Sequence, residues 1–292
     1  MKNIFKNVLL VLGILSASTC DSHKEATPIT SSSPSFDQEY WLFVGNPGAG
    51  KSSIVNALAG KEVSKAEVSQ TGAGVTTAFI SYNDVANKRI YLDTPGLEET
   101  DLNKKNNAAK QIEMALKQNG KYKIFFIINL DAGRVSPADV ATFNTVMDAI
   151  NLSHKPFSII LNKIEKDEKS LLENDKARAL IFTNLNSGNN KTQSIWFIEK
   201  NEKVRKKKIP SLILGDKLWA FFNTRESIKI SEEQIREVNT NSLEGRKKAL
   251  EATLEQIKTE FENDKAKQKV IIDKMTIKFN TLKTQIEKFT NQ

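Results

Sequence analysis

The chain has 292 residues, of which 39% are hydrophobic and 27% are charged. This balance favours a compact core joined to a solvated helical extension and excludes disorder throughout. The net charge of +8 comes from basic residues spread along lysine-rich segments, with no basic arm or aromatic-interleaved patch, so nucleic acid is not an expected partner. A single cysteine, Cys20, excludes an intramolecular disulfide, and two histidines give a structural zinc site little to build on.

Residues 1–20 resemble a targeting segment, because two lysines precede an apolar stretch from Val8 to Leu15 and small residues follow it. The stretch is short for a transmembrane helix, which favours a signal peptide. Cys20 is similar to a bacterial lipoprotein acylation site, although Thr19 stands where a smaller residue is expected. An ordinary cleaved signal peptide and an apolar N-terminus without a targeting role are the alternatives. We expect an exported or membrane-associated protein, attached through its N-terminus.

Residues 21–38 are rich in Ser, Thr and Pro, which is typical of a flexible linker. From 39 to 225, short β-branched and aromatic runs alternate with helix-like segments, and several runs are apolar at consecutive positions. The alternation predicts a three-layer α/β fold with a mostly parallel six-stranded sheet covered by helices. The expected strands are 40–45, 77–82, 89–94, 123–130, 157–163 and 194–199. The expected helices are 51–59, 102–119, 137–150, 170–184 and 215–222.

Residues 226–292 differ, since from Ser231 onward there is no proline and Gly245 is the only glycine. Apolar residues fall there at alternating spacings of three and four, which predicts a long amphipathic helix or helical hairpin resembling a coiled coil. We expect it either to associate with a second copy or to pack back on the globular part. The apolar positions are Leu243, Leu250, Leu254, Ile257, Phe261, Ile271, Met275, Leu282 and Phe289. The polar residues that interrupt them are Lys247, Asp264, Gln268 and Lys278.

Residues Gly45–Ser52 read G-N-P-G-A-G-K-S and fit the phosphate-loop pattern G-x-x-x-x-G-K-[ST] between an expected strand and an expected helix. Glycines let backbone N–H groups converge on phosphates, and the helix adds unpaired N–H groups and the positive end of its dipole. Lys51 can place its charge between the β- and γ-phosphates, and the Ser52 hydroxyl can bind Mg²⁺. The residues assigned to the nucleotide here are Gly45, Asn46, Pro47, Gly48, Ala49, Gly50, Lys51, Ser52 and Ser53.

A second motif, Y-L-D-T-P-G, ends the third expected strand with Asp93. A carboxylate at that strand end can bind Mg²⁺ through water, and the Gly96 N–H can contact a γ-phosphate and move when it leaves. Between the two motifs, a glycine-containing stretch leads to Thr76 and Thr77, either of which can offer a hydroxyl to the metal. We favour Thr76, which comes just before the expected strand, although the same residues also suit an ordinary strand start.

In order and spacing, G-N-P-G-A-G-K-S-S, the threonine loop and D-T-P-G resemble the P-loop GTPases of the translation-factor-related class, from Tyr40 to about Phe222. The resemblance implies a G domain that binds GTP or GDP and Mg²⁺. It implies Lys51 and Thr76 as catalytic residues, and Ser52, Thr76 and Asp93 as metal ligands.

Residues 130–139, L-D-A-G-R-V-S-P-A-D, are similar to a sequence box of the immune-associated and septin-like GTPases. In those proteins the box lies near a dimer face that depends on the nucleotide. The similarity makes Arg134 either an interface residue or an ordinary surface arginine, and the sequence does not decide between them.

The base-recognition motif N-K-x-D of the class here reads Asn162-Lys163-Ile164-Glu165. Asn162 is expected to brace the phosphate loop and Lys163 to cover the base. Glu165 offers the carboxylate one methylene further out than Asp does, and Asp167 is the nearest substitute. Guanine is therefore the expected base. Leu97 stands where some GTPases have a glutamine that orients water, so we expect slow hydrolysis unless another group does so.

The first hypothesis is a slow, Mg²⁺-dependent GTPase that acts as a switch or assembly protein and self-associates through its G domain or its C-terminal helices. The alternatives are a membrane-tethered structural protein that binds nucleotide without cycling, and an ATP-using P-loop enzyme. A basic run at 203–208 either meets anionic lipid or is a solvated loop. Because GTP is scarce outside cells, the G domain is expected to face a nucleotide-containing cytoplasm.

Overall fold

The structure is a computed structural model that describes residues 37–64, 76–99, 101–200 and 214–290, without the side chains of residues 279 and 281–290. The expected targeting segment with Cys20, the linker up to residue 36, most of the glycine-containing stretch before Thr76 and the basic run 203–208 lie outside these residues. Among the described helices, none combines the length and the apolar character that crossing a membrane requires.

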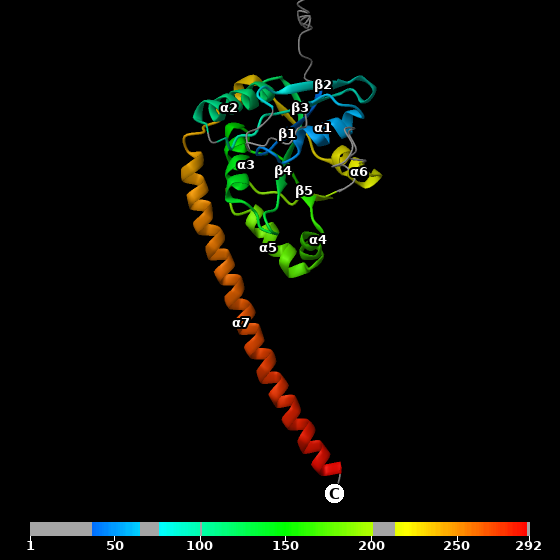
Figure 1. Cartoon of the computed structure of the whole chain (residues 1–292), viewed down its shortest axis with the longest axis vertical. Coiled ribbons are helices and arrows are strands. Elements are labelled where there is room, and N and C mark those ends of the chain that lie inside the picture. The colour runs from blue at the N-terminus through cyan, green and yellow to red at the C-terminus, as the bar shows by residue number, and fades with distance from the viewer. Residues whose placement is uncertain (1–36, 65–75, 100, 201–213, 291–292) are drawn as a thin grey trace, which may run out of the picture. The chain divides into compact units, whose positions relative to one another are not determined.

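A seven-stranded sheet organises the chain, with the strand order β2-β3-β1-β4-β5-β6 and β7 paired to β4 (Figure 1). The neighbouring strands from β3 to β6 are parallel, whereas β2 is antiparallel to β3 and β7 is antiparallel to β4. The strands are β1 Glu39–Val44, β2 Ile80–Asp84, β3 Arg89–Asp93, β4 Gly120–Asn129, β5 Ser158–Ile164, β6 Ile195–Glu199 and β7 Ile228–Ile230. The predicted α/β class with a mostly parallel sheet is confirmed, and β7 is an addition to the six expected strands.

Seven α-helices accompany the sheet in the described residues: α1 Lys51–Ala59, α2 Leu102–Leu116, α3 Pro137–Ala149, α4 Lys166–Glu173, α5 Asp175–Leu185, α6 Asp216–Thr224 and α7 Leu243–Thr290. Short 3₁₀ turns lie at Val85–Asn87 and Glu232–Gln234. The expected helix 170–184 is two helices, α4 and α5. Asn174 separates them, because it ends α4 in extended backbone and its side chain accepts the N–H groups of Lys176 and Ala177 at the start of α5.

Two apolar clusters cover the two faces of the sheet, which explains why strand residues are apolar at consecutive positions. On β1, Tyr40, Leu42 and Val44 face the cluster that contains α2, α3 and α5. Trp41 and Phe43 face the other cluster, which α1 and α6 complete. Each face of the sheet therefore buries alternate residues of β1. The loop that follows β1 lies at the edge of the sheet, outside both apolar clusters.

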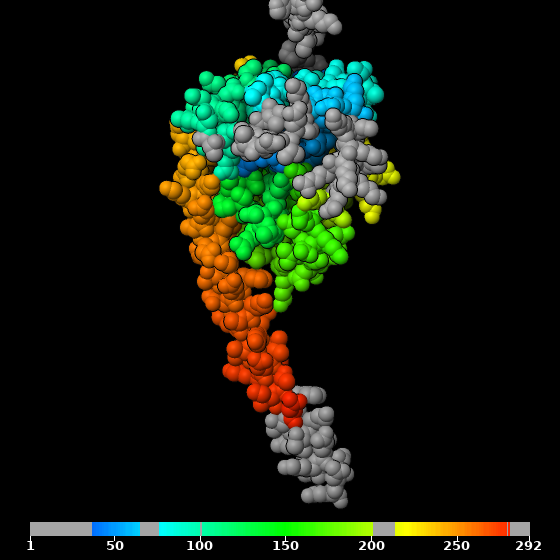
Figure 2. Space-filling view, viewed as in Figure 1, coloured from blue at the N-terminus to red at the C-terminus, as the bar shows by residue number. Residues whose placement is uncertain are grey.

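The long C-terminal helix α7 is buried at its start and exposed further along. Leu243 and Leu250 belong to the core, where the first turns of α7 pack along α3 (Figure 2). From position 270 the apolar residues are exposed, namely Val270, Ile271, Ile272, Met275 and Ile277. The predicted helix is confirmed. Its first part packs on the globular part, while its exposed part is compatible with association with a second chain.

Candidate nucleotide-binding site

The phosphate loop, Gly45–Ser52, connects β1 to α1 and needs glycine where it turns into the helix. Gly50 caps α1 with φ +102°, a backbone conformation that side chains rarely adopt. A Cβ atom on Gly50 would lie 2.3 Å from Nδ2 of Asn162. The loop can therefore bend only because this position has no side chain, and the space is taken by a residue of the expected base-recognition motif.

Lys51, the first residue of α1, is buried inside the phosphate loop. Its Nζ donates to the carbonyl oxygens of Gly45 at 2.9 Å and Asn46 at 3.2 Å. Burial lowers the pKa of Lys51, while the carboxylates of Asp93 and Asp139 act to raise it. The cation is held where the loop backbone converges, which is the position from which it can reach a phosphate chain.

Ser52 and Asp93 form the candidate metal site. The Ser52 hydroxyl donates to Oδ2 of Asp93 at 2.7 Å, and Asp93 is fully buried at the end of β3. Its other oxygen, Oδ1, has no hydrogen-bond partner among the described residues. Burial raises the pKa of Asp93, and the Lys51 charge and the Ser52 hydrogen bond oppose this. A buried carboxylate oxygen without a partner is costly, so this pair of hard oxygen ligands fits Mg²⁺.

The segment after β3 lies directly against the phosphate loop. The Thr94 hydroxyl donates to the Phe43 carbonyl of β1 at 2.8 Å. A Cβ atom on Gly96 would lie 2.4 Å from the backbone nitrogen of Pro47, so only glycine fits there. The next residue, Leu97, is fully buried in the apolar core. The backbone of Gly96 therefore lies near the place where the phosphates of a nucleotide are expected, whereas the Leu97 side chain is packed into the core.

The end of β5 fastens onto the phosphate loop. Asn162 Nδ2 donates to the Ala49 carbonyl at 2.8 Å, and Lys163 Nζ donates to the Gly48 carbonyl at 2.5 Å. The pairing of β5 with β6 shifts register between Leu161 and Ile164, and Lys163 takes a positive φ of 59° there. This irregularity directs two consecutive side chains toward one loop, which a regular strand would send to opposite faces.

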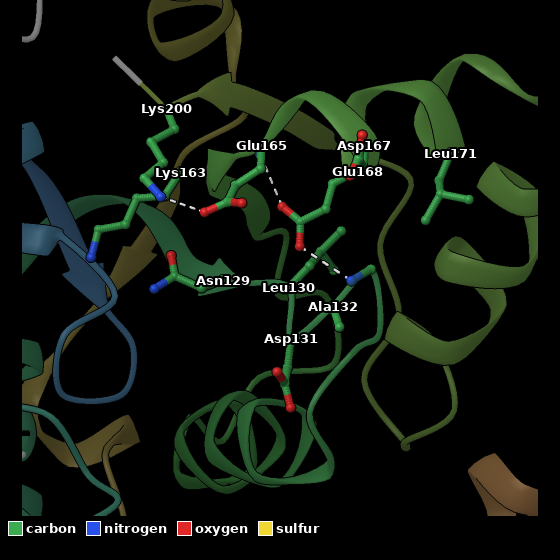
Figure 3. Close-up of a pocket in the computed structure, with 11 residues that line it drawn as sticks. Asn129, Leu130, Asp131, Ala132, Lys163, Glu165, Asp167, Glu168, Leu171 and Lys200 are labelled. Carbon is green, nitrogen blue, oxygen red and sulfur yellow. Dashed lines mark hydrogen bonds and ion pairs between the residues drawn. The ribbon is translucent and has the colours of Figure 1, made fainter. Parts of the chain in front are cut away.

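A cavity of about 560 Å³ opens beside this contact, within the size range of small-ligand pockets (Figure 3). Glu165 and Asp167, the two carboxylates considered for base recognition, both line it. The Glu165 carboxylate forms an ion pair with the ammonium group of Lys200. The full lining is Asn129, Leu130, Asp131, Ala132, Gly133, Lys163, Glu165, Asp167, Glu168, Leu171 and Lys200.

Glu168 joins the two rims of this cavity. One of its carboxylate oxygens accepts the backbone N–H of Glu165 at 3.0 Å, and the other accepts that of Gly133 at 3.2 Å. The start of α4 is thereby tied to the loop after β4. Glu168 is committed to backbone groups, which leaves Glu165, Asp167 and Asp131 as the lining carboxylates that a ligand can meet.

A polar network connects the phosphate loop to α3 and α7. The Asn46 amide donates to Asp139 at 2.7 Å and to Glu98 at 3.4 Å, and it accepts from the Thr142 hydroxyl at 2.8 Å. Lys247 of α7 donates to the other oxygen of Glu98 at 2.6 Å. Burial raises the pKa of Asp139 to about 7, against the lowering effect of the Asn46 hydrogen bond. A smaller cavity of about 180 Å³ lies at this network.

Part of the globular region is similar to a known family of GTPases. Residues 41–163 match the family model described as 50S ribosome-binding GTPase. The α/β fold with a mostly parallel sheet, that of a P-loop G domain, agrees with this match. The matched residues contain the phosphate loop, the Asp93 motif and the first two residues of the base-recognition motif, and the match ends at Lys163.

Curated relatives of this part of the chain are named as bacterial GTPases or as probable GTP-binding proteins. The chain is 29% identical over 127 residues to the GTPase Era of Neisseria meningitidis, which covers 43% of this chain and 38% of Era. It is 32% identical over 132 residues to the probable GTP-binding protein EngB of Thermotoga petrophila, covering 44% and 63%. The match thus spans 38% of the length of Era and 63% of the length of EngB, less than two thirds of either protein.

Among solved structures, the chain is similar to Toc33 from Arabidopsis thaliana in complex with Mg²⁺ and GMPPNP, with 17% identity and a TM-score of 0.45. That similarity covers 66% of this chain and 89% of Toc33. The more specific likeness of residues 130–139 to immune-associated and septin-like GTPases stays a prediction.

Three of the predicted residues make none of the hydrogen bonds described above for the site: Thr76, Ser53 and the candidate interface residue Arg134. Thr76 is half-buried before β2, and none of the hydrogen bonds among the described residues joins it to Ser52 or Asp93. Its neighbour Thr77 is tied to α2, since the Thr77 carbonyl accepts from Asn107 at 2.7 Å. Ser53 and Arg134 are exposed. The structure thus brings together the phosphate loop, Asp93, Gly96 and the base motif, and it places the threonine segment against α2.

The sequence did not indicate that the residues after β4, Asn129 to Gly133, line this cavity, and it indicated no role for Glu168. A general signal was available, because β4, β5 and β6 are neighbouring parallel strands whose carboxyl ends meet at one edge. Residues that directly follow those strands are therefore candidates for the same pocket of the G domain.

Proposed function

We propose that this protein binds GTP and GDP with Mg²⁺ and hydrolyses GTP slowly, as a nucleotide-dependent switch. The observation that carries the proposal is the direct contact between the base motif and the phosphate loop. Asn162 and Lys163 donate to consecutive carbonyls, those of Ala49 and Gly48. A ligand with a base at one end and phosphates at the other fits such a joined site. The curated relatives, which are named as GTPases or GTP-binding proteins, support the same ligand class.

Each end of the site has groups suited to one part of the nucleotide. Lys51 and the N–H groups of the phosphate loop neutralise and orient the phosphates. Ser52 and Asp93 would hold Mg²⁺, which supplies charge neutralisation at the β- and γ-phosphates when bound. Glu165 accepts hydrogen bonds from the base edge, and Lys163 covers the base. Thr76, whose neighbour Thr77 is bonded to α2, would complete the metal site by bringing its hydroxyl to the ion.

The network from Asn46 to Glu98 and Lys247 supports a switch. Gly96 lies against the phosphate loop, and Glu98 follows it by two residues and bonds to α7. A γ-phosphate that engages the Gly96 N–H displaces this short segment and with it the contact to Lys247. The start of α7 then responds to the nucleotide, and the exposed residues Val270 to Ile277 offer a surface for self-association.

A second function is favoured by one observation, namely that Leu97 is fully buried. Its apolar side chain cannot orient a water molecule and is packed in the core, which suits a protein that binds nucleotide without turnover. In both cases we propose that the N-terminal segment attaches the protein to a membrane or directs its export, with the G domain facing a cytoplasm that contains nucleotide. Nucleic acid is not among the partners that we propose.

Titration of the purified protein with GDP, GTP, ADP and ATP in the presence of Mg²⁺ tests the binding proposal. Guanine nucleotides should bind about 100-fold more tightly than adenine nucleotides, because adenine leaves the carboxylate of the base site unpaired. Lys51→Ala should abolish binding at the same nucleotide concentrations. Equal affinity for ADP and GDP would favour the ATP-using alternative, and unchanged binding by Lys51→Ala would refute the site.

Phosphate release measured at increasing protein concentration separates the two functions. A rate per molecule that rises with concentration supports a switch completed by self-association, since a second protomer can supply what Leu97 does not. Tight binding with no release above the Lys51→Ala background at any concentration supports the non-cycling protein.

A further inference from the structure

Lys200 is the first residue after β6 and meets the base-recognition motif twice. Its backbone N–H donates to the Ile164 carbonyl at 2.8 Å, which fixes the start of its side chain beside β5. Its ammonium group pairs with Oε1 of Glu165 at the rim of the base cavity (Figure 3). Both residues line the same cavity, so the pair lies where a bound base would be read.

The Lys200–Glu165 pair explains how a glutamate can replace the aspartate that the base-recognition motif usually has. Glutamate has one more rotatable bond than aspartate, and fixing it on a ligand costs more side-chain entropy. The Glu165 side chain is 60% exposed, and apart from Lys200 its carboxylate meets only the backbone N–H of Glu168, in the capping box that begins α4. Lys163, the other lysine of the lining, is committed to the Gly48 carbonyl and so is not available to hold the carboxylate.

We propose that Lys200 determines base specificity by positioning the Glu165 carboxylate for the guanine edge. This inference rests on the proposed function, since it needs a guanine nucleotide in the cavity. Lys200 contacts Oε1 only, so Oε2 and the remaining lone pairs can accept from the N1–H and the 2-amino group of guanine. An adenine edge presents an acceptor at N1 and lacks the 2-amino group, so the positioned carboxylate faces no matching pair of donors.

An exposed ion pair contributes little to folding stability, typically about 0–1 kcal/mol. The effect of Lys200 is therefore expected in ligand selectivity. A bound base covers the pair and lowers the local dielectric, which strengthens the hydrogen bonds that a correctly held carboxylate makes. A lysine with a merely structural role would change the affinity for all nucleotides alike.

The test compares GDP with IDP, whose hypoxanthine base lacks only the 2-amino group. In the unaltered protein we expect GDP to bind about 10-fold more tightly than IDP, the value of one charge-assisted hydrogen bond. Lys200→Met removes the charge and keeps the length, and it should lower the GDP-to-IDP ratio to about 2-fold. Lys166→Met, which alters an exposed lysine next to Glu165, is the matched variant and should leave the ratio unchanged.

A double-substitution cycle shows whether Lys200 acts through Glu165. In a Glu165→Gln background, Lys200→Met should change the GDP-to-IDP ratio by less than about 2-fold, because the partner charge is already gone. If the ratio survives Lys200→Met in the unaltered background, or if its loss persists in full with Glu165→Gln, the inference is wrong while the proposed guanine binding stands. If the unaltered protein fails to bind GDP, both proposals fall.

Discussion

The two ends of the candidate site are built in opposite ways. At the phosphate end, Lys51 is 6% exposed and Asp93 is fully buried, and each is bonded to the loop or to its neighbour. At the base end, the Glu165 and Lys200 side chains are 60% and 42% exposed, and they are held by one ion pair and by the capping box that Glu165 forms at the start of α4. Packing in the core fixes the side chains of the phosphate end, so few substitutions are tolerated there. The base end faces solvent, so a glutamate fits in place of an aspartate and a neighbouring lysine can set the position of its carboxylate.

The largest effect is expected from a methyl group at the point where the two ends meet. Gly50→Ala should weaken GDP binding by more than about 1,000-fold, because its Cβ overlaps the Asn162 amide and φ is +102°. Isothermal titration of GDP measures this. Gly48→Ala is the comparison, since it also has a positive φ, +75°, but no atom lies within 4 Å of its Cβ. It should cost about 10-fold or less through backbone strain alone.

Equal losses for Gly50→Ala and Gly48→Ala would show that backbone strain decides the outcome and that the Asn162 contact is dispensable. The phosphate end and the base end of the site would then bind their parts of the nucleotide independently.

Burial at the phosphate end should also make stability depend on pH. Burial raises the pKa of Asp139 to about 7, with Asn46, Glu98 and Lys51 as the groups that face it. The folded state therefore keeps a proton that the unfolded chain releases, so the free energy of unfolding falls as pH rises from about 4 to 7. Asp139→Asn keeps an acceptor for Asn46 and removes this loss.

The free energy of unfolding of Asp139→Asn, relative to the unaltered protein, should rise by about 2 kcal/mol between pH 5 and pH 8, as urea denaturation measures. Parallel pH profiles for Asp139→Asn and the unaltered protein would mean that the phosphate end is more open to solvent than its packing indicates.

The sequence predicted the buried end of the site better than the exposed end. The phosphate loop and Asp93 follow strands that are apolar at consecutive positions, and that pattern together with the glycine spacing needs only local information. β7 was not predicted because Ile-Lys-Ile is too short to show the periodicity of a strand. It is a strand because it pairs with Gly120–Tyr122, which is distant in the sequence. The Lys200–Glu165 and Lys247–Glu98 pairs join residues 35 and 149 positions apart, and only the folded chain brings them together.

The smallest expected effect concerns how the phosphate end reaches the C-terminal helix. Lys247→Met keeps the aliphatic stem of this side chain and removes its bond to Glu98, in which both side chains are about one-third exposed or less. Because the bond holds the segment after Gly96, its loss should raise the affinity for a non-hydrolysable GTP analogue about 3-fold relative to GDP. Lys258→Met, whose partner Glu255 lies within α7, should not alter that ratio. A ratio that stays constant in both variants would mean that α7 packs on the G domain without sensing the nucleotide, and the burial of Leu250 alone would then account for its position.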